Sequence, residues 1–462
     1  MRAPVIVFAG WLLGLPGAAD AAARMDPGEW ARARELPVGA TTTFADLPLG
    51  PSRSGAVRMQ RIDVYASDAK ILVATADGLR ELPRSDWLHF IADATVPGAP
   101  RMGLSLSADG REATGLVIAD DGRTLAISSK RGPGGLALET HDASRDAEGN
   151  PTRFACDNHK LAWQQLGMPQ VPAPVVAAPD PGPQVATRTA TVAVDTDNEL
   201  LNLKFGNNTT NATNYLAQLF TGMNAIYERD LDLRLLQGTT ILRVSTTPDP
   251  WSGGLGADPR VQLDEFGAFW QANQAAVSRA FAMLLSGKSA SNNSSSGVAW
   301  VLGGSNYCTS TNAINGHYSV SQVFKFAGSN ASHDLLVVAH EIGHNFGANH
   351  THCSNSSTGA GPTASNTIDQ CYNLESDPPP TGPGCYGGAQ ACPAPATVNG
   401  VSNVTGTLMS YCHLSGLPGC SSSQVFATAH RTLLNPRVAN NVTNGCFAPI
   451  SAGNNIFANG FE

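Results

Sequence analysis

One stretch constrains the chain more than any other part of it: residues 340–350 read HEIGHNFGANH. The preceding residues 335–339 are all apolar, so we expect a helix that begins near Asp334. On such a helix His340 and His344 lie four positions apart on one face, where both imidazoles can bind one metal ion. The stretch therefore predicts a metal site built on a helix.

The residues that follow extend this predicted site. Gly347 can adopt the left-handed backbone conformation that a β-carbon disfavours, so the chain can turn back and present His350 as a third ligand. Glu341 follows the first ligand, where its carboxylate can reach a water on the metal. Three neutral imidazoles leave the fourth position of a zinc ion open, which is typical of catalytic rather than structural zinc. The alternative is a helix whose surface histidines bind nothing.

The stretch resembles the signature of the metzincins, a group of zinc endopeptidases, which reads His-Glu-x-x-His-x-x-Gly-x-x-His. Residues 406–411, GTLMSY, resemble the methionine turn of that group, with Met409 beneath the metal. Within the metzincins, HEIGHNFG is most similar to the adamalysin (reprolysin) branch. The resemblance covers about residues 187–447 and implies an α+β, zincin-like fold, with a mixed twisted sheet and long helices.

Three features depart from the adamalysin pattern. Thr351 stands where that branch usually has an aspartate, and the interval between His350 and Met409 is long and holds four cysteines. Tyr411 lies two residues after the methionine, as in the astacin and serralysin branches, where this tyrosine can approach the metal. Two roles stay open for Tyr411: stabilising the developing oxyanion, or packing under the site with a hydrogen-bonded hydroxyl. We expect His352 to lie near the site without binding the metal.

The resemblance implies metal-assisted hydrolysis of peptide bonds with one catalytic Zn²⁺ ion. Zinc would lower the pKa of its water toward about 7 and polarise the scissile carbonyl. Glu341 would take the water proton and return it to the leaving amine. Residues 297–303 would be the sheet edge on which an extended protein or peptide substrate adds as a further strand. A structural Ca²⁺ ion also occurs in relatives, but no acidic cluster in the sequence supports one.

A rival interpretation from another class is a zinc-binding adhesion or matrix module that has lost catalysis. The intact Glu341 argues against it, because a degenerate site has no need of a base at this position.

Composition and the first residues indicate a protein that works outside the cell. Charged residues make up 14% of the 462 residues, where about 25% is usual, and the net charge of −8 argues against a nucleic-acid binder. Arg2, an apolar run over residues 5–15 and small residues after it predict a signal peptide over residues 1–22. The run is too short to span a membrane. We expect a secreted, extracellular monomer, which would pass through the periplasm in a bacterium.

A proline-rich linker over residues 171–186 divides the rest of the chain. Residues 23–170 show alternating apolar residues and Asp-Gly turns, which predict a β-rich region. We interpret this region as a propeptide; the alternative is a binding domain that the mature protein keeps. Residues 187–448 would form the catalytic domain. Residues 449–462 would be a tail, either frayed or a sorting tag.

Apolar periodicity predicts the main elements of the catalytic domain. In chain order they are a strand over 190–194, a helix through 215–227 with Asn211 or Thr213 as its N-cap, a strand over 231–244, a helix over 266–285 and the edge strand over 297–303.

The nine cysteines divide at the linker into one and eight. The even set after the linker predicts four disulfides in a secreted domain. The resemblance to adamalysins implies a Cys308–Cys446 bond. Cys156 precedes the linker, and a thiolate is a strong zinc ligand. Because propeptides of several metzincin branches use such a cysteine, we expect Cys156 to bind the zinc in the latent form only; the alternative is an incidental or intermolecular cysteine.

Overall fold

A computed structural model of the chain describes residues 23–132, 135–144, 154, 156, 186–251, 258–288, 296–301, 303, 306–308, 316–325, 331–375 and 384–450. The predicted signal peptide, nearly all of the proline-rich linker and most of the predicted tail lie outside these residues. Within the described ranges, no helix has both the length and the apolar character needed to cross a bilayer.

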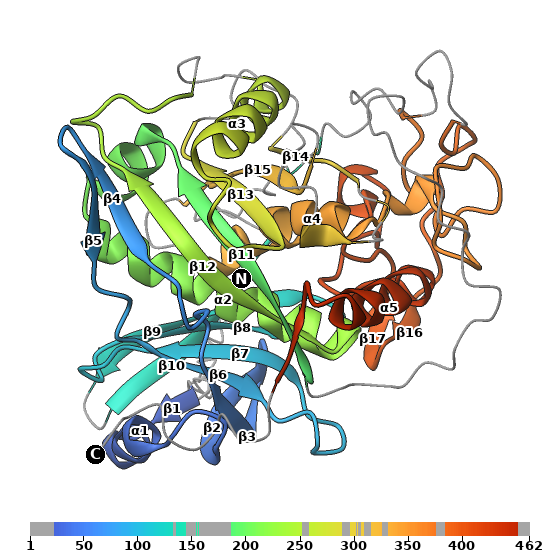
Figure 1. Ribbon diagram of the computed structural model, residues 1–462. Coiled ribbons are helices and arrows are strands. Elements are labelled where there is room, and N and C mark those ends of the chain that lie inside the picture. The colour runs from blue at the N-terminus through green and yellow to red at the C-terminus, as the bar shows by residue number, and fades with distance from the viewer. Residues whose placement is uncertain are drawn as a thin grey trace, which may run out of the picture.

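The N-terminal region folds into an antiparallel sheet of eight strands, in the order β1-β10-β9-β8-β7-β6-β3-β2 (Figure 1). Its strands are β1 (Ala23–Met25), β2 (Thr41–Gly50), β3 (Arg53–Ile62), β6 (Leu88–Ala92), β7 (Arg101–Leu106), β8 (Ala113–Ile118), β9 (Thr124–Gly132) and β10 (Gly135–Asp142). Helix α1 (Pro27–Glu35) begins at a capping box formed by Asp26 and Glu29, and Trp30 packs against the apolar core of this sheet. The predicted β-rich character of this region is confirmed.

The second sheet has the order β14-β15-β13-β11-β12-β4-β5, and β18 also pairs with β11. Its strands are β4 (Ile71–Thr75), β5 (Gly78–Leu82), β11 (Arg188–Thr196), β12 (Leu233–Arg243), β13 (Phe281–Ser286), β14 (Gly297–Ala299), β15 (Tyr318–Gln322) and β18 (Ala448–Pro449). The five central strands run parallel, whereas β14, β5 and β18 are antiparallel to their neighbours. This arrangement confirms the expected mixed sheet and α+β class.

Two strands of this second sheet come from the N-terminal region. β4 pairs in parallel with β12, with Ile71 opposite Thr240, and β5 closes that side of the sheet. The alternation of residues 70–74 predicts a strand but says nothing about its partner, because parallel pairing depends on contacts distant in sequence. The predicted domain boundary at the linker therefore does not separate the two sheets.

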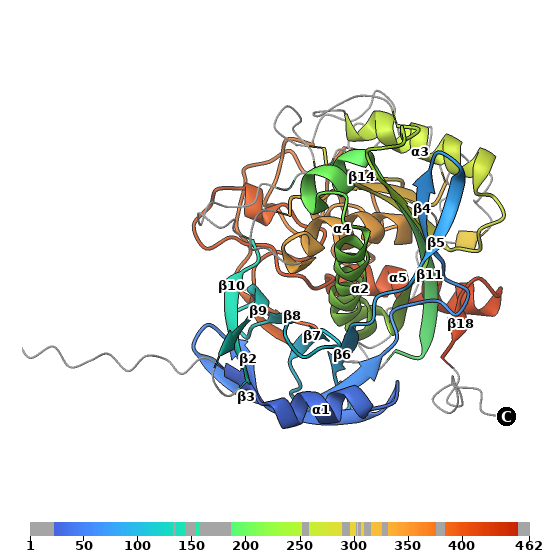
Figure 2. The same ribbon diagram turned by 90° about the vertical axis from the view of Figure 1, so that its left-hand side faces the viewer.

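Helix α2 (Thr209–Leu231) lies between the two sheets and contacts β12 on one side and β6, β7 and β8 on the other (Figure 2). Its apolar residues, including Leu216, Phe220 and Met223, are buried in the core of the second sheet. The N-cap is Asn208, whose side chain accepts a hydrogen bond from the Asn211 amide, so the predicted caps were placed too late in the sequence.

The helix predicted over 266–285 is wrong in its second half. Helix α3 covers Pro259–Asn273, begins at the N-cap Asp258 and is followed by strand β13. Residues 281–285 are apolar and all of residues 281–286 are buried, and such a short run cannot be assigned to helix or strand by periodicity alone. The predicted strand over 297–303 is shorter than expected, since β14 ends at Ala299.

The remaining elements all lie within residues 200–443. They are helices α4 (Leu335–Phe346) and α5 (Thr428–Thr443), the hairpin of β16 (Ala396–Val398) and β17 (Val401–Val404), 3-10 turns over Ala331–His333, Thr351–Cys353 and Cys412–Leu414, and a π-helical turn over Leu200–Lys204.

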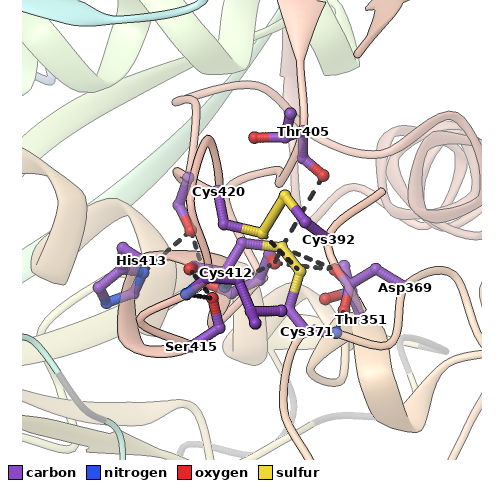
Figure 3. Close-up of a disulfide and its surroundings, with 12 residues drawn as sticks. Thr351, Asp369, Cys371, Cys392, Thr405, Cys412, His413, Ser415 and Cys420 are labelled. Carbon is purple, nitrogen blue, oxygen red and sulfur yellow. Dashed lines mark hydrogen bonds between the residues drawn. A yellow bond between two sulfur atoms is a disulfide. The ribbon is translucent and has the colours of Figure 1, made fainter. Parts of the chain in front are cut away.

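Four disulfides tie the second half of the chain together, and they use all eight cysteines after the linker. The Cys308–Cys446 bond implied by the resemblance is present, and the others are Cys353–Cys385, Cys371–Cys412 and Cys392–Cys420. Figure 3 shows the last two close together, beside the methionine turn. Cys156 is buried and lies outside these four disulfides, so the division into eight and one is confirmed.

Candidate metal centre

Helix α4 has the position and extent that the sequence predicts. It begins after Asp334 and ends at Gly347, whose φ of 100° is left-handed and whose amide donates to the carbonyls of Gly343 and His344. A β-carbon on Gly343 would meet the Met409 sulfur at 2.7 Å, so this glycine lets the methionine turn pack directly against the helix. Met409 therefore lies against the helix that carries His340 and His344.

The three predicted histidine ligands converge through their Nε2 atoms. The separations are 3.1 Å for His340–His344 and 3.2 Å for both His344–His350 and His340–His350. A tetrahedral zinc ion with Zn–N bonds of about 2.0–2.1 Å requires N–N separations of about 3.3 Å, so this triangle fits such an ion.

The opposite ring nitrogen of each histidine is held by a hydrogen-bond acceptor. His340 Nδ1 donates to the Leu408 carbonyl at 2.8 Å, and His344 Nδ1 donates to the Ala348 carbonyl at 2.7 Å. His350 Nδ1 donates instead to the Glu375 carboxylate at 2.8 Å. Each bond puts the ring proton on Nδ1 and leaves the Nε2 lone pair directed toward the shared point.

Burial keeps the rings of His340 and His344 uncharged. It lowers the pKa of both His340 and His344 well below the ordinary value, and the neighbouring histidines lower it further. A neutral imidazole is the form that binds a metal.

The thiol of Cys156 lies close to the point on which the three Nε2 atoms converge. Its Sγ is 3.6 Å from His344 Nε2, close to the separation of about 3.6 Å that joint ligation of zinc by a thiolate and an imidazole requires. The ligand atoms of Cys156 and the three histidines all lie within 4.8 Å of one another, and all four residues are buried. The structure therefore brings together the four residues predicted to bind metal.

Glu341 lies beside the same point. Its Oε2 is 3.4 Å from the Cys156 thiol, and a β-carbon on Gly297 would approach its Oε1 to 2.4 Å. The carboxylate is fully buried between α4 and the edge strand β14. Cys156 forms an isolated parallel bridge with Gly297, so the cysteine segment lies along that edge.

Tyr411 holds the backbone of Cys156. Its hydroxyl accepts from the Cys156 amide at 2.6 Å and donates to the Cys156 carbonyl at 2.7 Å. Burial raises the pKa of Tyr411 well above its ordinary value, and the nearby Cys156 and carboxylates raise it further, so the hydroxyl stays protonated. The predicted site residue is therefore at the centre, with a hydroxyl that can donate a hydrogen bond.

Three neighbouring side chains were not predicted to take part. Phe154 packs edge-on against His340 with ring centroids 4.8 Å apart and stacks on His413, whose Nε2 donates to the Phe154 carbonyl at 2.9 Å. Glu375 bonds both His350 and His352. No sequence pattern marks Phe154 or Glu375, because neither lies in a periodic segment; tertiary contacts bring them to the site.

Other clusters of metal-binding side chains occur in the described ranges, and each contains histidine or cysteine. One joins His350, His352, Cys353 and Glu375, and the other consists of cysteines that form disulfides. Calcium prefers oxygen ligands, so these clusters give no support to the calcium ion considered above.

Comparison with known proteins agrees with this geometry. Residues 186–398 match a reprolysin family model described as metallo-peptidase family M12. The match includes β11, α2, α4 and the three histidines and stops before the methionine turn. No curated protein matches the chain. Residues 186–398 therefore match the metallo-peptidases of family M12, and this match indicates a zinc metalloprotease domain over these residues.

Proposed function

We propose that the chain is a secreted endopeptidase in which His340, His344 and His350 hold one catalytic zinc ion. The observation that carries this proposal is the triangle of Nε2 atoms, 3.1–3.2 Å apart, with the Glu341 carboxylate beside it. When bound there, zinc would supply the Lewis acidity that polarises a peptide carbonyl and acidifies a water molecule.

Glu341 is the general base in this proposal. It is adjacent to His340 in sequence and faces the point where the thiol of Cys156 now lies, which is where an attacking water would be placed. The carboxylate takes the proton of that water and passes it to the leaving amine. Tyr411 keeps its proton and donates a hydrogen bond to the oxygen on which negative charge develops.

The substrate is an extended protein or peptide segment that pairs with β14. Gly297 already pairs with the backbone of Cys156, so this edge accepts an added strand next to Glu341. Backbone hydrogen bonds on such an edge give affinity without selecting side chains.

Cys156 keeps the precursor inactive. Its thiolate would take the fourth zinc position, from which it excludes water, and Tyr411 fixes its backbone through two hydrogen bonds. Phe154 anchors the same segment between His340 and His413. Residues 23–170 would accordingly act as a propeptide and be cut from the catalytic domain within the linker over 171–186.

One observation favours a second organisation, in which the N-terminal region stays with the mature enzyme and only the Cys156 segment leaves. β4 belongs to the catalytic sheet, and Ile71 lies in the same apolar core as Val192 and Leu235. N-terminal sequencing and the intact mass of the active secreted form distinguish the two organisations: one chain starting near residue 187, or two chains that elute together in size exclusion.

Zinc analysis combined with a proteolysis assay tests the activity itself. The active secreted protein should contain one zinc ion per chain, lose casein hydrolysis on chelation and regain it when zinc is returned. Full hydrolysis by protein freed of zinc would overturn the proposal.

A further inference from the structure

Glu375 connects two histidines with one carboxylate oxygen. Its Oε2 lies 2.8 Å from His350 Nδ1 and 2.9 Å from His352 Nε2. All three side chains are almost completely buried, with exposed fractions of 2% for Glu375, 3% for His350 and 0% for His352. An ionised carboxylate accepts hydrogen bonds but cannot donate one, so both ring nitrogens point N–H groups at it.

This bond distinguishes His350 from the other two histidines of the triangle. His340 and His344 donate to backbone carbonyls, whereas His350 donates to a charged group. A hydrogen bond to a carboxylate is stronger than one to a carbonyl and makes the opposite ring nitrogen more basic. The need for such support is physical: His350 lies beyond Gly347, after the helix has ended, so helical geometry does not fix its ring.

Two disulfides and a stacked histidine pair restrain the position of Glu375. It lies between Cys353 and Cys385, which form a disulfide, and four residues after Cys371, which is bonded to Cys412 beside the methionine turn. The His352 ring stacks on His350 with an interplanar angle of 13°. The carboxylate is therefore fixed to the same cross-linked loop that follows the third histidine.

We propose that Glu375 is a positioning residue that orients His350 and strengthens its bond to zinc. His352 donates a second hydrogen bond that holds the carboxylate in place. The proposal rests on the proposed function, since it takes His350 to be a zinc ligand. Glu375 itself does not touch the metal, because its oxygen bonds Nδ1 and the triangle is formed by Nε2.

The test measures zinc affinity in the full-length chain carrying Cys156→Ser, so that the thiol contributes nothing. Glu375→Gln and Glu375→Ala should each weaken zinc binding by about 10–100-fold in competition with a chromogenic chelator, as losses of such outer carboxylates typically do. They should also shift the visible absorption band of the Co²⁺-substituted protein, which a purely structural carboxylate would leave unchanged.

Asp369→Asn is the matched control. Asp369 (Figure 3) is a buried carboxylate on the same loop. It accepts a hydrogen bond from Ser410 Oγ at 2.8 Å rather than from a histidine. The zinc affinity of the Asp369→Asn variant should equal that of the parent protein. The near-isosteric Glu375→Gln provides the answer if Glu375→Ala does not fold.

Two different failures can be told apart. If the parent binds zinc tightly and both Glu375 variants bind it equally well, the positioning role is wrong and the proposed function stands. If the parent binds zinc with no dependence on His340 and His344, the zinc site itself is wrong.

Discussion

The thiol of Cys156 lies 3.4 Å from the carboxylate of Glu341, although 185 residues separate them in sequence. The thiol also faces the three imidazoles, so it occupies the space that a water molecule would need in order to be activated. The cysteine proposed to keep the precursor inactive is thus in contact with the proposed general base.

Replacing Cys156 with Ser should activate the uncut precursor. A serine hydroxyl is a much weaker zinc ligand than a thiolate, so the fourth position opens to water. We expect casein hydrolysis by the full-length variant to exceed that of the wild-type precursor by at least about tenfold, which corresponds to about 1.4 kcal/mol. A precursor that stays as inactive as the wild type would show that Cys156 does not keep the precursor inactive.

Gly297→Ala should impair catalysis while leaving zinc bound. The added β-carbon would come within 2.4 Å of Glu341 Oε1, and the carboxylate must move away from its position. Displacement of a general base should lower kcat by about 10²-fold or more in the Cys156→Ser background. Gly132→Ala is the control, because its β-carbon would meet no atom within 4 Å. Equal rates for both variants would contradict the assigned place of Glu341.

Breaking the ion pair between the N-terminal sheet and helix α2 should destabilise the whole chain. Arg101 of β7 and Asp230 of α2 are 2.6 Å apart with exposed fractions of 2% and 0%, and Arg101 also donates to the Asn399 carbonyl. Arg101→Ala leaves a buried charge without its partner, which should cost about 3–5 kcal/mol of unfolding free energy in urea. The exposed pair Arg53–Asp120 is the comparison, and Arg53→Ala should cost at most about 1 kcal/mol. Equal losses would mean that the buried contact between β7 and α2 contributes no more to stability than an exposed ion pair.

Acid should destabilise the chain partly through His89. Burial lowers the pKa of His89 from 6.5 to about 3, so in this range the unfolded state takes up a proton that the folded state does not. Stability should therefore fall as pH falls from about 6.5 to 3, by up to about 1.4 kcal/mol per pH unit from this residue. His89→Gln should flatten the measured slope, whereas substitution of the exposed His141 should not. An unchanged slope in His89→Gln would show that its ring is protonated in the folded state.

More of the site than of the fold could be predicted from the sequence. His340, His344 and His350 lie within one local motif, and helix geometry alone brings the first two together, so their convergence followed from spacing. The Cys308–Cys446 disulfide could be predicted only from the resemblance to adamalysins. Glu375 was not predictable, because a loop without periodicity and two disulfides determine where it lies.

The fold was harder to predict where partners are distant in sequence. The strand over 71–75 was visible as alternating residues, but its pairing with β12 across the predicted domain boundary was not. Residues 281–285 were assigned to a helix because a fully buried strand shows no alternation. In both cases tertiary contacts determined what the local pattern left open.

The most direct test of the central claim is the rate of casein hydrolysis by Glu341→Gln in the Cys156→Ser chain, measured on protein shown to carry one zinc ion. Loss of the general base should reduce the rate by about 10²–10⁴-fold while the zinc content stays the same. Hydrolysis at the parent rate by the zinc-loaded variant would contradict the proposed mechanism.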